Sequence, residues 1–198
     1  MRRLALLFLM VVSVGAWVPV HAGQSYEKYR ALTAHQHAQR DGQTALAGAY
    51  AIVAFSPNGG GTRLVVRAIN HARQQILVQA YSFSSRPIIR ALEEAKARGV
   101  GVYVILDHSN LRSRYSGLRA MVAHGIPVWI DTTVRIAHSK VMIIDGRNVI
   151  TGSFNFSWSA QHMNAENVLE IVGSPTLARF YIQNWAWRRS LSQPYGHQ

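Results

Sequence analysis

Residues 137–155 read AHSKVMIIDGRNVITGSFN, in which two apolar runs flank the segment Asp145-Gly146-Arg147-Asn148. An Asp-Gly pair between two apolar runs is a strong signal for a tight β-hairpin turn. The runs 137–144 and 149–154 are therefore predicted to be neighbouring antiparallel strands.

On both sides of this hairpin, short apolar runs alternate with segments whose apolar residues recur at helical spacing. The additional strands are expected at 51–55, 76–83, 100–106, 128–130 and 167–172, and the helices at 62–74, 87–98, 111–124 and 175–191. Repeated β-α-β units predict an α/β fold, with a mixed β-sheet flanked by helices on both faces. This domain is expected to span residues 50–191.

The first 22 residues have the features of an export signal. Met1-Arg2-Arg3 is basic, an apolar run extends to about Val14, and Val20-x-Ala22 resembles a cleavage site. We therefore expect a cleaved signal peptide at 1–22 and an exported protein, periplasmic or secreted. An uncleaved membrane anchor is the alternative, although the apolar run is shorter than the roughly 20 residues that span a bilayer. Residues 23–49 form a polar extension with no assigned role.

The composition indicates which partners to expect. The chain has 198 residues and a net charge of +12, from 21 Lys and Arg against 9 Asp and Glu. It contains no cysteine, which excludes a disulfide framework and a thiolate metal site, and 48% hydrophobic residues exclude a disordered tail. A strongly basic chain favours polyanionic partners such as nucleic acid or anionic lipid headgroups.

Four polar residues stand out in the otherwise apolar hairpin. Because alternate residues of a strand share a face, His138 and Lys140 are expected to project together, as are Ser153 and Asn155. A cation and neutral hydrogen-bonding groups suit a phosphate, and Gly152 permits a close backbone approach. The alternative is a buried strand histidine beside a lysine whose charged end reaches solvent.

The spacing His138-x-Lys140-x4-Asp145-x6-Gly152-Ser153-x-Asn155 resembles the HKD signature of the phospholipase D superfamily. Within that superfamily the chain is most similar to the single-motif bacterial endonucleases of the Nuc type. The resemblance runs from about Tyr50 to Trp187. It departs from a common form of the motif at Ser139, where an acidic residue often stands.

The resemblance implies phosphodiester cleavage without a metal or other cofactor. His138 would attack phosphorus, and Lys140, Ser153 and Asn155 would hold the phosphate oxygens. One imidazole cannot both attack and protonate the leaving oxygen, so a second histidine is needed. The chain has a single His-x-Lys, and we therefore expect a two-fold homodimer that brings two copies of His138 to one site.

Two carboxylates are given different roles. Glu166 resembles the family carboxylate that orients the nucleophilic histidine, although on its own it reads equally well as a surface residue. Asp145 belongs to the signature but lies on the hairpin turn, where a structural role is expected.

The segment after the third strand is polar and basic, and we expect it to contact substrate. His108, Arg112 and Arg114 are the candidates to line a positive groove for a nucleic-acid backbone, the alternative being a solvated loop. The expected activity is a non-specific endonuclease acting on DNA, with RNA as a further candidate. Two alternatives remain open: a lipid phosphodiesterase or transphosphatidylase, and a non-catalytic basic protein that binds nucleic acid. A membrane partner is expected only if the N-terminal segment is retained.

Overall fold

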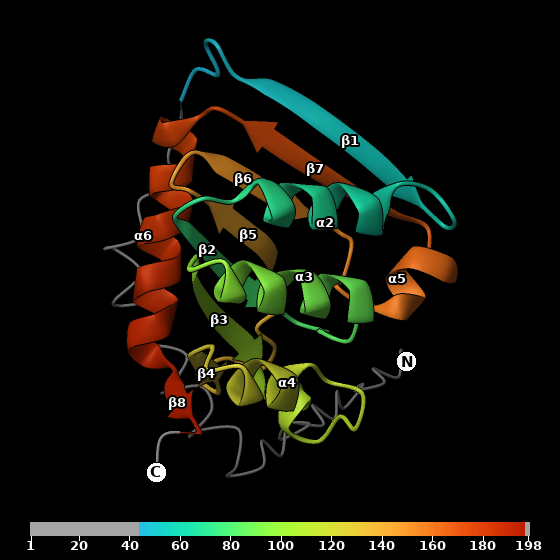
Figure 1. The fold of residues 1–198 in the computed structure, drawn as a ribbon, viewed down its shortest axis with the longest axis vertical. Coiled ribbons are helices and arrows are strands. Elements are labelled where there is room, and N and C mark those ends of the chain that lie inside the picture. The colour runs from blue at the N-terminus through green and yellow to red at the C-terminus, as the bar shows by residue number, and fades with distance from the viewer. Residues whose placement is uncertain (1–43, 197–198) are drawn as a thin grey trace, which may run out of the picture. The chain divides into compact units, whose positions relative to one another are not determined.

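The computed structural model describes residues 44–196, which contain one eight-stranded sheet with helices on both faces (Figure 1). The strands are β1 (Tyr50–Ser56), β2 (Gln75–Ala80), β3 (Gly101–Asp107), β4 (Val128–Asp131), β5 (Lys140–Ile144), β6 (Asn148–Gly152), β7 (Glu166–Val172) and β8 (Gln193–Tyr195). Their spatial order is β1-β7-β6-β5-β2-β3-β4-β8. The β2-β3 and β3-β4 pairs are parallel and the others are antiparallel, so the predicted mixed sheet is confirmed.

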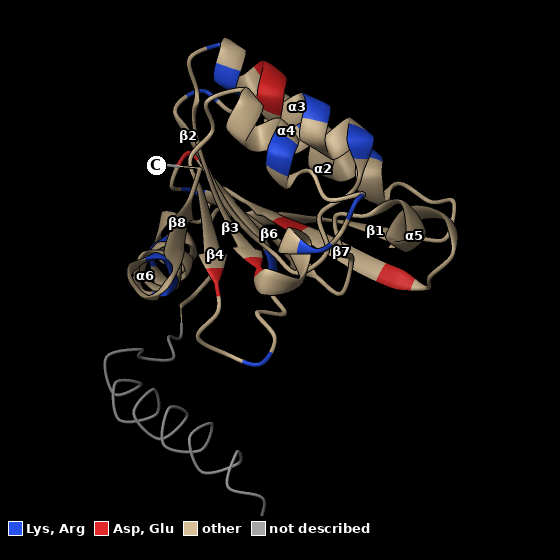
Figure 2. Ribbon diagram, turned by 90° about the horizontal axis from the view of Figure 1, so that it is seen from below, with Lys and Arg blue, Asp and Glu red and all other residues tan. Residues whose placement is uncertain are grey.

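The helices form a layer on each side of the sheet. Figure 2 shows α2 (Gly61–His71), α3 (Arg86–Ala97) and α4 (Leu118–Ala123) on one face and α6 (Pro175–Leu191) on the other. Each layer encloses its own apolar core. Because both faces of the sheet are covered, β5 in the middle of the sheet is buried along its whole length. The predicted arrangement of helices on both faces is therefore confirmed.

Two aromatic residues of α6, Trp185 and Tyr181, belong to the apolar core on the α6 face of the sheet. Trp185 is buried, its indole N–H donates to the carbonyl of Val78 at 3.0 Å, and its ring packs edge-on against Tyr103 and Trp129. An indole buried in this way needs a partner for its one donor, and Val78 supplies it.

The hairpin of β5 and β6 forms as the Asp-Gly signal predicts. Asp145 and Gly146 have φ angles of 52° and 63°, and Arg147 N–H donates to the carbonyl of Ile144 at 3.1 Å. Positive φ at both central residues is the type I′ geometry that fits the twist of the adjoining strands. The hairpin thus fixes the register Met142–Ile150 between β5 and β6.

Several predicted boundaries were wrong. The strand expected at 137–144 begins only at Lys140, because the pairing of β2 with β5 ends at Ala80–Lys140. The helix expected at 111–124 is replaced by a 3-10 turn, η2 (His108–Leu111), and the shorter α4, since the Asp107 carboxylate accepts the Ser109 N–H and starts a separate turn. Two short elements were missed, α5 (Trp158–His162) and β8. The sheet therefore continues beyond residue 191, where the domain was expected to end.

The predicted signal peptide and residues 23–43 of the polar extension lie outside the described residues. Within residues 44–196, no helix combines the length and apolar character needed to cross a membrane.

Candidate active site

The candidate residues gather where four strand ends meet at one edge of the sheet. Lys140 opens β5 opposite Ala80, the last residue of β2. Gly152 ends β6 opposite Val168, two residues after Glu166 opens β7. Antiparallel pairing thus brings together both ends of the sequence motif.

His138 lies in an irregular segment just before β5, and its side chain is exposed. This segment is fixed through its backbone: Ala137 N–H donates to the Asp107 carboxylate at 2.8 Å, and Tyr81 N–H donates to the carbonyl of Ser139 at 3.0 Å. The predicted strand alternation is therefore not what positions the imidazole. Anchors from β3 and from the residue after β2 position it instead.

Tyr81 provides a surface under both members of the His-x-Lys pair. Its ring centroid lies 4.7 Å from that of His138, with an interplanar angle of 56°, and 5.3 Å from the Lys140 Nζ. A cation at this distance from an aromatic face is stabilised by the ring quadrupole. No role was predicted for Tyr81 from the sequence; its position directly after a buried parallel strand was the available signal.

Lys140 is almost entirely buried, with 7% of its surface exposed. Burial lowers the pKa of its ammonium group below the ordinary value, and the negative charge of Glu166 partly offsets that shift. The Nζ donates to the carbonyl of His138 at 2.6 Å. The alternative of a lysine whose charged end reaches solvent is therefore wrong here.

Gly152 and Ser153 make a close contact with β7. Gly152 has a φ of 143°, and a Cβ at this position would lie 2.4 Å from the carbonyl oxygen of Asn167. Only glycine fits here, but the close approach is to β7 rather than to an open phosphate position. The Ser153 hydroxyl oxygen accepts from the Asn167 backbone N–H at 3.1 Å and from its side-chain amide at 3.3 Å.

Asn155 follows three residues after the end of β6. Its Oδ1 is buried and has no hydrogen-bond partner among the described residues. A buried polar atom without a partner costs about 1–3 kcal/mol, and such atoms are few in native proteins. The Oδ1 of Asn155 thus retains the capacity to accept a hydrogen bond at the end of the motif.

The two carboxylates behave differently. Glu166 Oε1 accepts from the Asn164 amide at 2.9 Å, and it makes no hydrogen bond with His138 within the described part of the chain. Orientation of His138 by Glu166 therefore stays a prediction. Asp145 accepts from the backbone N–H groups of three consecutive residues at 2.8–3.0 Å, and so ties the hairpin turn to the chain between α2 and β2; the three are Arg73, Gln74 and Gln75.

The predicted substrate-contacting residues lie on η2 and the loop that follows it. His108, Arg112 and Arg114 are all exposed. The Nδ1 of His108 lies 3.5 Å from the Asp107 carboxylate that also anchors Ala137. Asp107 therefore links this basic loop to the segment bearing His138.

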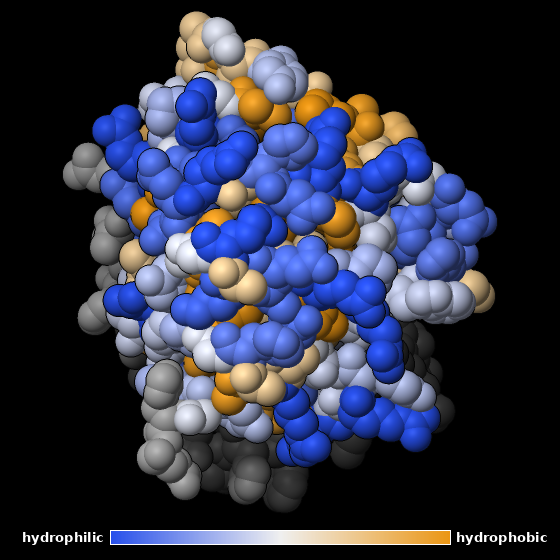
Figure 3. Space-filling model, viewed as in Figure 1, coloured by the Kyte–Doolittle hydropathy of each residue, from blue (hydrophilic) through white to orange (hydrophobic). Residues whose placement is uncertain are grey.

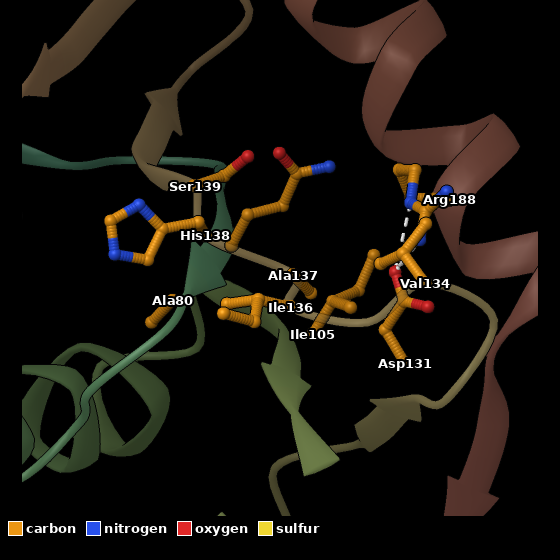
Figure 4. A pocket seen from close by; sticks show the side chains of 10 residues that line it. Ala80, Ile105, Asp131, Val134, Ile136, Ala137, His138, Ser139 and Arg188 are labelled. Carbon is orange, nitrogen blue, oxygen red and sulfur yellow. Dashed lines mark hydrogen bonds and ion pairs between the residues drawn. The ribbon is translucent and has the colours of Figure 1, made fainter. Parts of the chain in front are cut away.

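A cavity of about 210 Å³ lies beside that segment, on the face of the sheet covered by α6. In Figure 4 the Arg188–Asp131 ion pair stands at the opposite end of the cavity from His138, whose ring points away from it. Arg188 Nε donates to Asp131 at 2.8 Å, and Thr133 N–H donates to the same carboxylate at 3.1 Å. This buried ion pair fixes the start of the segment that leads to His138. The ion pair was not predicted from the sequence.

The functional groups at the site are the imidazole of His138, the ammonium group of Lys140, the hydroxyl of Ser153, the amide of Asn155 and the carboxylate of Glu166. Within residues 44–196, no group of three or more His, Asp or Glu side chains is arranged to hold a metal ion. Metal-independent chemistry stays a prediction.

Comparisons with known proteins agree on the family. Residues 65–187 match the family model described as "Cardiolipin synthase, PLD-like domain". The chain is 46% identical over 138 residues to a phospholipase D of Rickettsia prowazekii, covering 70% of this chain and 67% of that protein. The crystal structure of Nuc from Salmonella typhimurium, a phospholipase D family member, superposes with a TM-score of 0.71 at 37% identity, covering 74% of this chain and 98% of that one. With the HKD residues gathered at one edge of a mixed sheet, these matches establish that the chain belongs to the phospholipase D superfamily of phosphodiesterases.

Proposed function

We propose that this protein is a metal-independent, non-specific endonuclease that hydrolyses DNA, and also RNA, through a phosphohistidine at His138. The observation that supports this most directly is the pairing of an exposed imidazole with a buried ammonium group two residues away. The imidazole is accessible to a phosphodiester, and a buried cation acts on phosphate oxygens with little screening by water.

The proposed reaction has two steps, formation of a phosphohistidine and its hydrolysis. An unprotonated ring nitrogen of His138 attacks phosphorus, a P–N bond forms, and the P–O bond to the leaving oxygen breaks as that oxygen receives a proton. Water then attacks the phosphohistidine, gives up a proton, and releases the second product with His138 restored. Lys140 and the NH₂ group of Asn155 donate hydrogen bonds that stabilise the charge on the non-bridging oxygens in both steps.

The proton in each step comes from, and returns to, a second histidine. The sequence contains one His-x-Lys motif, so we assign this role to the partner subunit's His138 in a two-fold homodimer. Since the His138 side chain is exposed, a second copy can approach it without rearrangement of the core.

Nucleic acid is favoured as the substrate by charge. The chain has a net charge of +12, and exposed arginines flank the site on two loops: Arg112, Arg114 and Arg135. Such a surface attracts a phosphate backbone without reading its sequence. Export stays a proposal, and the charge argument would still hold after cleavage at residue 22, because the removed segment contains only two of the basic residues, Arg2 and Arg3.

A lipid phosphodiesterase is the second candidate, and a specific observation favours it. Two large apolar side chains near the site are exposed, Leu111 on η2 and Ile136 in the His138 segment. Side chains of this kind can enter the interfacial region of a bilayer. A basic protein without activity is disfavoured by the presence of His138, Lys140 and Asn155 together.

The test compares matched substrates in excess EDTA. Purified protein is given plasmid DNA, single-stranded RNA, and vesicles of phosphatidylcholine or cardiolipin, and released nucleotide and headgroup are measured. We expect nicking of DNA in EDTA and its loss in His138→Asn. Headgroup release without nicking would replace the proposal with the lipid reaction, and a requirement for Mg²⁺ would exclude the histidine mechanism.

A further inference from the structure

A large groove lies apart from the cavity beside His138. It has a volume of about 870 Å³, within the roughly 300–1,000 Å³ range of ligand sites. Three segments far apart in sequence form its walls: the start of α2, the start of α3, and α5. No function was predicted for this region, because α5 was not expected from the sequence.

The groove is basic. Arg63 from α2, Arg86 from α3 and His162 from α5 line it, and none of the described residues that line it is acidic. Figure 3 shows that the face over α2 and α3 is mostly hydrophilic. Ser85 and Arg86 at the start of α3 also line the groove, so the positive end of that helix dipole lies beside it; the Ser85 side chain makes no capping hydrogen bond there.

The groove also exposes aromatic rings. Trp158 is 60% exposed and Tyr115 is 67% exposed, and both line it. Trp158 and His162 are one helical turn apart on α5, with ring centroids 4.7 Å apart at an interplanar angle of 32°. Large aromatic rings left in solvent between basic side chains are typical of surfaces that stack nucleobases.

The chain connects this groove directly to the catalytic residues. Phe83 and Phe156 form a parallel bridge, and the N–H groups of Ser84 and Ser85 both donate to the carbonyl of Phe156, at 2.8 and 2.9 Å. One wall therefore begins three residues after Tyr81, which packs on His138, and another begins three residues after Asn155.

We propose that this groove binds an unpaired stretch of the nucleic-acid substrate, with bases stacked on Trp158 and Tyr115 and phosphates paired with Arg63 and Arg86. The inference rests on the proposed nuclease function and adds its strand preference. A duplex keeps its base faces inside the stack, whereas a single strand offers them to aromatic side chains. The protein therefore binds and cleaves single-stranded substrate in preference to duplex.

Binding is tested with the full-length His138→Asn protein in EDTA, so that the probe stays intact. The probes are a fluorescein-labelled thymidine oligonucleotide and a duplex of the same length, followed by anisotropy. We expect tighter binding of the single strand, and Trp158→Ala to weaken it by about fivefold or more, since stacking contributes about 1–3 kcal/mol per base. Tyr50→Ala is the matched control, because Tyr50 is an exposed aromatic residue of β1 that does not line the groove.

The basic side chains are tested by the salt dependence of binding. Arg63→Ala and Arg86→Ala should each lower the slope of log K against log salt by about 0.7, the value for one phosphate of a single strand. Arg90→Ala is the control on α3, exposed but outside the groove. Trp158→Phe keeps a stackable ring and should restore most of the affinity lost in Trp158→Ala, which separates stacking from a folding defect.

Failure of this inference is distinguishable from failure of the nuclease proposal. If DNA is nicked but single strand and duplex bind equally and Trp158→Ala changes neither, the groove assignment is wrong and the nuclease stands. If anionic vesicles bind instead of the oligonucleotide, and Trp158→Ala abolishes that binding, the groove is a lipid site and this inference is overturned. If no nucleic acid is bound or cut while lipid is hydrolysed, both fail together.

Discussion

The buried ammonium group of Lys140 donates a 2.6 Å hydrogen bond to the backbone carbonyl of His138, and it lies 5.3 Å from the centre of the Tyr81 ring against which the imidazole packs. One lysine therefore holds the backbone of His138, and in the proposed mechanism the same ammonium group supplies the positive charge at the reacting phosphate. These two roles require an ammonium group on a flexible stem, which the guanidinium of arginine does not reproduce.

The first prediction concerns that charge. Lys140→Met keeps the apolar stem but removes the ammonium group, and we expect kcat/KM for bis(p-nitrophenyl) phosphate in EDTA to fall by about 10²–10³. Lys96→Met, a change on α3 away from the site, should leave the rate unchanged. Wild-type rates in Lys140→Met would show that phosphate charge is neutralised elsewhere.

The second prediction concerns pH. Burial lowers the pKa of Lys140 and the Glu166 carboxylate raises it, so Glu166→Gln lowers that pKa further. Because catalysis needs the protonated ammonium, activity is lost as pH rises through this pKa, and the alkaline limb of kcat/KM should move to lower pH in Glu166→Gln. The pH profile of Glu94→Gln, an exposed change on α3, should match the wild type. If the alkaline limb does not move in Glu166→Gln, the Glu166 charge does not influence the pKa of Lys140 during catalysis.

The third prediction concerns the shared site. Wild-type and His138→Asn subunits are mixed in equal amounts, exchanged, and assayed at constant total protein. If both copies of His138 serve one reaction, about a quarter of the activity remains, whereas independent subunits would retain about half. If half of the activity remains, the homodimeric site is refuted. A fully active protein that light scattering shows to be a monomer would also refute it.

The fourth prediction concerns Asp145. Asp145→Ala removes the acceptor for three backbone N–H groups and places a Cβ residue without a polar side chain at a φ of 52°, so unfolding free energy should fall by about 1–3 kcal/mol. The kcat/KM of the folded protein should stay near the wild-type value. Asp145→Asn, which tolerates positive φ and keeps a carbonyl oxygen, should lose less stability in the same urea titration. A selective loss of activity without loss of stability would instead give Asp145 a chemical role.

The sequence predicted the fold from local patterns that tertiary contacts did not override. The Asp-Gly turn between β5 and β6 and the alternation of apolar runs with helical spacing were sufficient to predict the mixed sheet. The segment 137–139 was misjudged because its composition suits a strand, whereas its backbone is captured by Asp107 and Tyr81. Such long-range side-chain anchors leave no periodic signal.

The same distinction applies to the site. His138 and Lys140 were found from spacing, and the structure places them together, but by a hydrogen bond and a shared tyrosine rather than by strand alternation. No functional role was predicted for Tyr81 or Trp158, because a single aromatic residue near a strand end or in a short segment forms no sequence pattern of its own. Only the three-dimensional structure shows one against the imidazole and the other exposed in a groove.

The central claim, that His138 is the nucleophile, is tested most directly by trapping the intermediate. The protein is mixed with an oligonucleotide labelled at internal phosphates in excess EDTA, quenched in alkali within the first turnover, and digested for mass spectrometry. The account predicts a covalent nucleotidyl adduct on His138 that is stable in alkali, labile in acid, and absent from His138→Asn. Cleavage at the wild-type rate by His138→Asn, with no adduct on His138 in the wild-type protein, would contradict it.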